Sequence, residues 1–537
     1  MEVNGGPAPA KQGADDDQTI PLQKYRTTLY MNSDQGPEKL QTTGPKFKTA
    51  LYTKTDTGDM VELNLNDDSD ADDSRKRHEG LNFQQTIFLI AGYCPGFAAT
   101  IMMVAIVNTG WVGFLVFAAL IFLLAYAAIL LGSCWNMVRV AWFEDLNPYG
   151  AIAYEACGTW ARHTVNVLVD LASFGGGTVM LLATSELILV VIGPQLYGTY
   201  CYWPLIIGAI MCPAIWVGMP KHFWLLGALS IVTTLLAILL IFIDAAIYLH
   251  GNGRALAEFQ PPIESWAFGK LIGATIFLLG GHFVYPEIQR AMKEPGNFDR
   301  SALTTFLLIV VFLFPTLLVV FVTYGDIIAP NDIDLEAGLL SVLPRGALVV
   351  IPGLLLLISS ASVMLIIINP LFSHLEEVLN IQEGINWKRI LLRTSVIILI
   401  VFLAETVNEF ALLVTVVGGV VFPLLTFLAP AVSYLRLRSM HMPDSFSERP
   451  KMHIFESIVS FLLILVTPVT VIAVLAITIV ALTNDQTGYV KPCYVQYNAT
   501  SVEWANDTLP TNATWANDTL PTNATWANGS SLTTVAM

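Results

Sequence analysis

Five ionisable side chains interrupt long apolar stretches of this sequence, and their chemical types make them candidates for proton or ligand binding. They are Asp170, Glu186, Asp244, His282 and Glu287. Ionisable groups are costly inside apolar segments, so they are functional candidates by default. Asp170 and Glu186 stand 16 positions apart, about four and a half helical turns, which places them on roughly opposite faces. We do not expect these two carboxylates to form one site.

His282 and Glu287 are the strongest of these candidates. An imidazole titrates near neutral pH, so His282 can exchange protons or donate a hydrogen bond to a carboxylate. A neutral ring that is bonded to a backbone carbonyl is the alternative. Glu287 follows Pro286 and suits a gate, although a hydrated carboxylate near Arg290 explains it equally well.

The composition indicates which kind of element must hold these side chains. Of the 537 residues, 54% are hydrophobic and only 13% are charged, and the mean hydropathy is +0.61. That balance is typical of an integral membrane protein. The apolar runs approach the roughly 20 residues that span a bilayer and lack the alternation of barrel strands. We predict an all-α fold of about eleven transmembrane helices, over residues 84–107, 111–134, 162–192, 202–219, 223–249, 267–288, 302–324, 344–372, 388–405, 409–435 and 455–482.

The chain divides into three regions. Residues 1–81 form an acidic tail of low hydrophobicity, for which we predict disorder and a cytosolic location. Such a tail can recruit cytosolic partners by folding on binding, and its charge indicates no role with nucleic acid. Residues 82–482 form the transmembrane region, and residues 483–537 form a polar tail.

Two independent signals orient the helices. With a cytosolic N-terminus, most loop lysines and arginines fall on the cytosolic side, as the positive-inside rule requires. An odd number of helices then places the C-terminus outside, where we predict N-glycosylation of the polar tail. The alternative is an expansion of the unit "WANDTLPTNAT" that contains the acceptor motif by accident. The acceptors are Asn498, Asn506, Asn512, Asn517, Asn523 and Asn528.

One apolar phrase occurs twice, as "TIFLIAGYCP" at 86–95 and "TIFLLGGHFVYP" at 275–286. Five helices separate the two copies, so they cross the membrane in opposite senses. An inverted repeat of five helices with a Gly/Pro-interrupted helix in each half is typical of a transporter with a midplane site. We expect both helices to unwind there, because Pro lacks a donor and Gly weakens a helix. Packing kinks are the alternative.

Unwound backbone inside a membrane must line a cavity or contact a solute. Free N–H groups from about Phe97 and Ala98 suit a carboxylate, and carbonyls near Gly280 to His282 suit an ammonium. These two features together describe a zwitterion such as an amino acid. The candidate substrate-binding residues are Gly92, Tyr93, Gly96, Phe97, Ala98, Gly280, Gly281 and His282.

Several segments resemble the amino acid/auxin permease family. The strongest is "GGHFVYPEIQRAMKEP", 280–295, which looks like the family signature. Residues 110–135 and 147–162 are similar to the family's second helix and the linker after it. Residues 368–378 and 416–437 resemble the ends of its eighth and tenth helices. The resemblance implies an 11-helix LeuT-like fold, a 5+5 inverted repeat with broken first and sixth helices.

One departure from the family pattern affects the expected pocket. Alignment sets the family's first-helix Gly-x-Gly against Gly96, Phe97 and Ala98, so the second glycine is absent. The usual proline falls on Met103, whereas Pro95 stands just before the motif. Phe97 can therefore narrow or reshape the pocket.

The resemblance also implies a co-transported ion rather than a resident cofactor. We favour a proton, on the basis of His282 and the family likeness. Sodium is the alternative, held by carbonyls of the broken first helix and by hydroxyls of "SSAS", namely Ser359, Ser360 and Ser362. Serines in membrane helices more often bond their own backbone or allow close packing.

The six cysteines form no CxxC or CxxH pair, so no metal or redox site is predicted. Cys201 and Cys493 both fall on the predicted outer side, where the oxidising compartment allows a disulfide.

We predict a secondary active transporter of small neutral amino acids that works by alternating access, with no enzymatic site. The rivals are a nutrient sensor that binds an amino acid with little flux and an uncoupled uniporter or channel. The plasma membrane is slightly preferred over a lysosomal or vesicular membrane.

Overall fold

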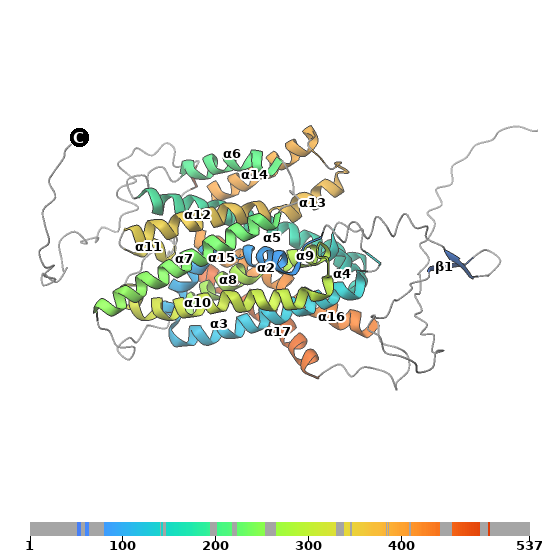
Figure 1. The fold of residues 1–537 in the computed structure, drawn as a ribbon, viewed down its shortest axis with the longest axis horizontal. Helices are drawn as coiled ribbons and strands as arrows, with labels where there is room; N and C mark the ends of the chain where they lie inside the picture. The colour runs from blue at the N-terminus through green and yellow to red at the C-terminus, as the bar shows by residue number, and fades with distance from the viewer. Residues whose placement is uncertain are drawn as a thin grey trace, which may run out of the picture. The chain divides into compact units, whose positions relative to one another are not determined.

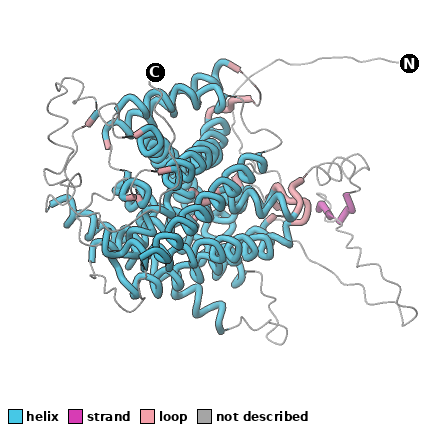
Figure 2. Tube along the Cα trace, turned by 60° about the vertical axis from the view of Figure 1, so that its left-hand side comes forward, coloured by secondary structure: helices cyan, strands magenta, loops and turns pink. Residues whose placement is uncertain are grey.

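The computed structural model has two compact units, divided between Asp70 and Ala71. The first contains an antiparallel hairpin in which β1 (Leu51–Lys54) pairs with β2 (Met60–Leu63), drawn in magenta in Figure 2. The structure describes residues 51–54, 60–63, 80–139, 141–142, 147–193, 201–216, 223–252, 265–328, 338–343, 346–382, 384, 386–407, 410–440, 454–483 and 492–493.

The hairpin lies within the N-terminal tail, for which the composition predicts disorder. Its strands read LYTK and MVEL, in which apolar and polar residues partly alternate, as strand pairing favours. Average composition over 81 residues hides such a short local pattern. The rest of the tail up to residue 79 lies outside the described residues.

The second unit is built from helices (Figure 1). In chain order the α-helices are α2 Phe83–Gly92, α3 Gly96–Val138, α4 Pro148–Cys157, α5 Thr159–Ile192, α6 Trp203–Trp216, α7 Phe223–Asn252, α8 Ser265–Leu279, α9 Tyr285–Arg290, α10 Phe298–Ile328, α11 Leu339–Val342, α12 Ala347–Ile367, α13 Asn369–Val378, α14 Trp387–Thr406, α15 Phe410–Val416, α16 Ala429–Met440 and α17 Ile454–Thr483. The 3₁₀-helices are η2 Gly281–Val284 and η3 Pro295–Asn297, and the π-helices are η5 Val417–Val421 and η6 Leu424–Leu428.

Within the described residues, eight helical segments are long and apolar enough to cross a membrane, and α2 and α6 are shorter apolar helices. Where the structure describes them, the predicted membrane segments coincide with helices except at residues 93–95, Gly280, Gly346 and Ile368. The predicted first and second segments share α3, which bends at Gly110 with φ 65° and ψ −158°. Only glycine adopts this backbone conformation readily, so Gly110 marks the boundary between two membrane passes.

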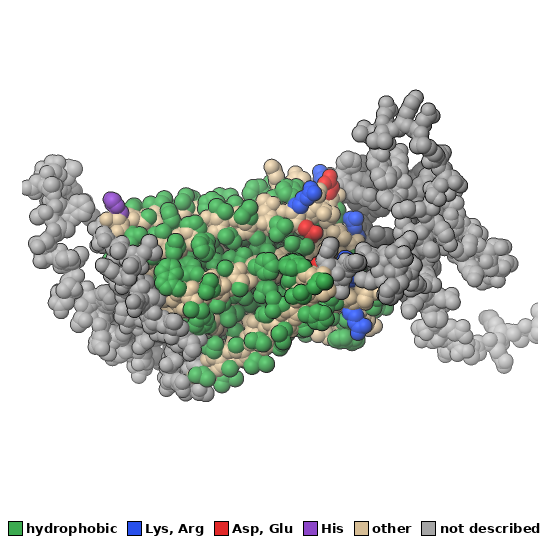
Figure 3. All heavy atoms as spheres, turned by 90° about the horizontal axis from the view of Figure 1, so that it is seen from below, with side chains coloured by type: hydrophobic (Ala, Val, Ile, Leu, Met, Phe, Trp, Pro, Cys, Tyr) green, Lys and Arg blue, Asp and Glu red, His purple; other side chains and the backbone are tan. Residues whose placement is uncertain are grey.

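The surface of the helical unit is suited to lipid. In Figure 3 hydrophobic side chains cover most of the face between its ends, and the visible Lys, Arg, Asp and Glu gather toward one end. On α17 the exposed Phe461, Leu465, Val469 and Ile472 recur at helical spacing along one side. An apolar surface of this extent requires lipid around it, which makes the protein an integral membrane protein.

Close glycine contacts hold the two interrupted helices against their neighbours. A Cβ built on Gly92 of α2 would lie 2.2 Å from Gly227 Cα of α7. A Cβ on Gly418 of η5 would lie 2.2 Å from the Gly273 carbonyl oxygen of α8. Small residues at such crossings let helix backbones approach closely in membranes. The first helix of each predicted five-helix half therefore packs on the last helix of the same half.

The start of α2 is tied to the end of α9. Leu81 N–H donates to the Ala291 carbonyl at 2.7 Å, and Lys293 N–H donates to the Leu81 carbonyl at 2.9 Å. Asn82 and Gln85 then form a capping box at the first turn of α2. These bonds join Leu81 to the helical unit.

Candidate functional site

The first interruption falls where the Gly/Pro pattern predicts it. α2 ends at Gly92, residues 93–95 are not helical, and α3 begins at Gly96. The prediction of a free N–H at Ala98 is wrong for this conformation, because that group donates to the Pro95 carbonyl at 3.0 Å. A tight turn after Pro95 satisfies the donor within the chain.

The second interruption is a change of helix type around a single non-helical residue. α8 ends at Leu279, Gly280 is not helical, and the 3₁₀-helix η2 leads into α9. The Gly280 carbonyl accepts a hydrogen bond from Thr426 Oγ1 of η6 at 3.3 Å. One of the carbonyls predicted to suit an ammonium is therefore accessible to a side-chain donor.

The two interruptions contact each other through Tyr93. A Cβ on Gly281 would lie 3.1 Å from Tyr93 Cδ1, so the ring packs against the glycine backbone. The Tyr93 ring meets Phe283 edge to face, with 5.8 Å between centroids. Its hydroxyl donates to the Ile366 carbonyl of α12 at 3.3 Å. Phe422 packs on Phe283, so aromatic rings surround the junction of the broken helices.

In the structure the His282 ring is bonded to a backbone carbonyl, which the sequence analysis gives as the alternative to a proton-exchange role. Its side chain is fully buried, and Nε2 lies 2.9 Å from the Leu124 carbonyl oxygen of α3. The ring also packs on Tyr285, with 4.7 Å between centroids. In this conformation the imidazole thus holds η2 against α3.

The serines of α12 make different contacts from one another. Ser359 Oγ lies 3.0 Å from Ser230 Oγ and 2.8 Å from Thr234 Oγ1, both on α7. Ser362 donates to the Ile358 carbonyl of its own helix at 2.9 Å. Ser360 Oγ is buried with no hydrogen-bond partner among the described residues. Ser359 therefore joins α12 to α7, and Ser362 makes the backbone bond expected of an ordinary membrane serine.

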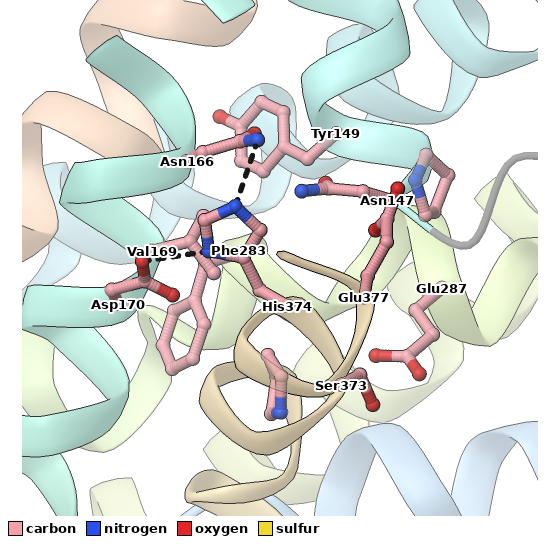
Figure 4. Close-up of a pocket in the computed structure, with 12 residues that line it drawn as sticks. Asn147, Tyr149, Asn166, Val169, Asp170, Phe283, Glu287, Ser373, His374 and Glu377 are labelled. Carbon is pink, nitrogen blue, oxygen red and sulfur yellow. Dashed lines mark hydrogen bonds and ion pairs between the residues drawn. The ribbon is translucent and has the colours of Figure 1, made fainter. Parts of the chain in front are cut away.

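A small pocket lined largely by polar side chains, the polar pocket, lies beside η2 and α9 (Figure 4). Its most prominent contact joins His374 Nδ1 of α13 to Asp170 Oδ2 of α5 at 2.7 Å. Asn166 Nδ2, one turn earlier on α5, lies 3.4 Å from His374 Nε2. The pocket is lined by Asn147, Pro148, Tyr149, Asn166, Val169, Asp170, Phe283, Glu287, Pro370, Ser373, His374 and Glu377.

Two of the predicted ionisable candidates, Asp170 and Glu287, line this pocket. Asp244 lies elsewhere and accepts a hydrogen bond from Tyr324 of α10 at 2.7 Å. Sequence reasoning missed His374, which falls two residues beyond the predicted segment 344–372 and so was not counted among membrane residues. A longer eighth segment would have included it, but its pairing with Asp170 across 204 positions has no sequence signal.

The structure joins Cys201 and Cys493 in a disulfide with 5.4 Å between the Cα atoms. This is the pairing that the predicted topology allows. The predicted glycan acceptors, Asn498 to Asn528, lie outside the described residues.

Replacing Cys201 by serine is expected to lower the free energy of unfolding by about 2–4 kcal/mol, because the bond closes a long loop. The measurement is the melting temperature of the purified protein, with disulfide loss checked by mobility on a non-reducing gel. Cys212→Ser is the matched control, since Cys212 is a free cysteine on α6. Equal melting temperatures for the two variants would contradict a stabilising role.

Comparison with known proteins agrees with this geometry. The family model described as "Transmembrane amino acid transporter protein" matches residues 85–479. Amino acid transporter AVT1E of Arabidopsis thaliana is 21% identical over 380 residues, covering 67% of this chain and 68% of that protein. Auxin transporter-like protein 3 of Medicago truncatula is 26% identical over 236 residues, covering 43% of this chain and 49% of that protein.

Among solved structures, MhsT in complex with L-phenylalanine superposes with a TM-score of 0.52 at 14% identity, covering 73% of this chain and 98% of that chain. The match establishes a LeuT-like fold, and the family consists of transporters rather than enzymes. Because the family model covers most of the sequence, the chain belongs to the transmembrane amino acid transporter family.

Proposed function

We propose that the protein is a secondary active transporter of small neutral amino acids, driven by a proton gradient and working by alternating access. The observation that carries the proposal is the contact of the two broken helices through Tyr93 and Gly281. Discontinuous helices that meet at mid-membrane form the substrate site in transporters of this architecture. Movement of either half-helix changes that contact.

The surroundings of the junction support a small substrate. Phe283 packs on both Tyr93 and Phe422 there, and Phe277 stacks on Phe422 with 5.2 Å between centroids. Rings in these positions limit the volume left for a side chain. The Gly280 carbonyl, which already accepts from the Thr426 hydroxyl, can accept from a substrate ammonium instead.

The hydroxyl contacts favour a proton over sodium. Ser359 bonds two hydroxyls of α7, and Ser362 bonds its own helix. These hydroxyls serve helix packing in this conformation, and Ser360 is the member of the group without a partner among the described residues. Glu287, which lines the polar pocket, remains our candidate gate, and His282 remains a candidate coupling group that must first leave the Leu124 carbonyl.

We place the protein in the plasma membrane, with a cytosolic N-terminus and an extracellular, glycosylated C-terminus. The gathering of charged side chains toward one end of the helical unit supports a defined orientation (Figure 3).

Uptake by the full chain in proteoliposomes tests the proposal. A panel of labelled amino acids is offered under an imposed proton gradient, an imposed sodium gradient and neither. We expect uphill accumulation of small neutral amino acids under the proton gradient alone. Binding without flux under every gradient would identify a sensor instead, and flux that no gradient drives uphill would identify a uniporter.

A further inference from the structure

We propose that Asp170 and His374 form the proton-binding site of the transport cycle, in the pocket between α5, α9 and α13. The inference rests on proton-driven transport as proposed above. It assigns the proton to a pair that joins the third and eighth membrane segments, rather than to His282. Four features of the pocket carry it.

The first feature is the hydrogen-bond pattern around the imidazole. His374 Nδ1 lies 2.7 Å from Asp170 Oδ2, so Nδ1–H donates to the carboxylate. The Asn166 amide nitrogen lies 3.4 Å from Nε2, where it can donate to the neutral ring with Nε2 as the acceptor. This nitrogen is the atom that an incoming proton from hydronium would bind.

The second feature is that Asn166 can serve both protonation states. Its side chain is buried, and Oδ1 has no hydrogen-bond partner among the described residues. Rotation of the amide brings Oδ1 to the place of the nitrogen, where it can accept from a protonated Nε2–H. Gly150 of α4 leaves room for this amide, since a Cβ there would lie 2.5 Å from Asn166 Oδ1. The site can therefore take up one proton without leaving a ring nitrogen unsatisfied.

The third feature is the partial exposure of the Asp170–His374 pair and the charge of its neighbours. The side chains of His374 and Asp170 are 18% and 22% exposed, whereas His282 is fully buried. Glu377 on α13 and Glu287 on α9 also line the pocket; the nearby cations are Arg162 of α5, which acts on His374, and Arg290 of α9, which acts on Glu287. The partly exposed ring thus lies where three carboxylates, with Asp170, outnumber these two cations.

The fourth feature is the connection to the moving parts. Phe283 of η2 and Glu287 of α9 form one wall of the pocket, and Phe283 packs on Tyr93 at the junction of the broken helices. Displacement of η2 and α9 therefore changes the surroundings of the Asp170–His374 pair. By linkage, protonation of the pair must change the equilibrium between the conformations in return.

Transport by the full chain in proteoliposomes tests the inference with His374→Gln and Asp170→Asn. We expect each variant to lose proton-driven accumulation at least ten-fold while it retains counterflow exchange of labelled substrate at equal pH. Exchange should also lose its dependence on pH between about 5.5 and 7.5, the range in which a histidine titrates. His163→Gln is the matched control, because His163 is an exposed histidine of the same helix α5.

Each other outcome has a definite meaning. Proton-driven accumulation at wild-type level in both variants would overturn this site and leave the proposed function standing. Loss of driven accumulation and exchange together, in protein of normal thermal stability, would also overturn it, because the pair would then be needed for every transport step. A wild-type protein that no proton gradient drives would overturn the proposed function as well. Where one variant fails to fold, the other decides.

Discussion

Replacing Gly92 by valine is expected to prevent stable assembly of the helical unit. A Cβ on Gly92 would lie 2.2 Å from Gly227 Cα, 2.3 Å from its carbonyl oxygen and 2.5 Å from its carbonyl carbon. All three atoms belong to backbone, so no rotamer change can relieve the overlap, and α2 must move away from α7. Overpacking of a core usually costs about 1–3 kcal/mol, and a backbone overlap exceeds that range. We expect aggregated protein and no measurable uptake.

The control for this prediction is Gly296→Ala, because a Cβ at Gly296 meets nothing within 4 Å. Monodisperse yield after detergent extraction and melting temperature are the measurements. Gly92→Ala, the smallest change, should already lower both clearly below wild type. A Gly92→Ala protein with wild-type yield and stability would show that α2 does not approach α7 this closely.

The same glycine illustrates what the sequence could predict. The positions of Gly92, Pro95 and Gly280 in the sequence predict where the two helices break. This is possible because Gly and Pro change the conformation and hydrogen bonding of their own backbone. They could not predict what the backbone would contact. Gly92 remains a predicted substrate-binding residue, and the structure adds its packing against Gly227, 135 positions later in the chain. Local conformation is encoded locally, but helix crossings depend on the whole fold.

The residues of the polar pocket show the same difference between what the sequence can predict and what depends on packing. Asp170 was identified from its type and depth, since an acidic residue in an apolar helix is conspicuous. Its partner His374 was not, because their contact requires α5 and α13 to meet. The central His282 was identified as a candidate, yet its bond to Leu124 depends on where α3 places that carbonyl. Side-chain type predicts which residues are capable of chemistry, and packing decides which of them can perform it.

Replacing Glu376 by alanine is expected to destabilise the protein by about 3–5 kcal/mol, the usual cost of breaking a buried ion pair. Glu376 Oε1 accepts from Arg389 Nε at 2.9 Å and from Arg393 Nε at 2.6 Å. Arg393 is 3% exposed, and its Nη1 also donates to the Ile215 carbonyl of α6 at 2.5 Å. Without the carboxylate, a buried guanidinium keeps its charge and loses its counterion.

The neighbouring Glu377→Ala is the matched control, because Glu377 is exposed and its loss leaves the Glu376 contacts in place. The decisive measurement is the double variant Glu376→Ala with Arg393→Met. Replacing both members of a buried pair by apolar groups is often neutral, whereas removing one leaves an uncompensated charge. The melting temperature of the double variant should therefore exceed that of Glu376→Ala alone. A further decrease in the double variant would mean that Arg393 stabilises α6, α13 and α14 through its packing on Phe372 and its bond to Ile215, independently of the carboxylate.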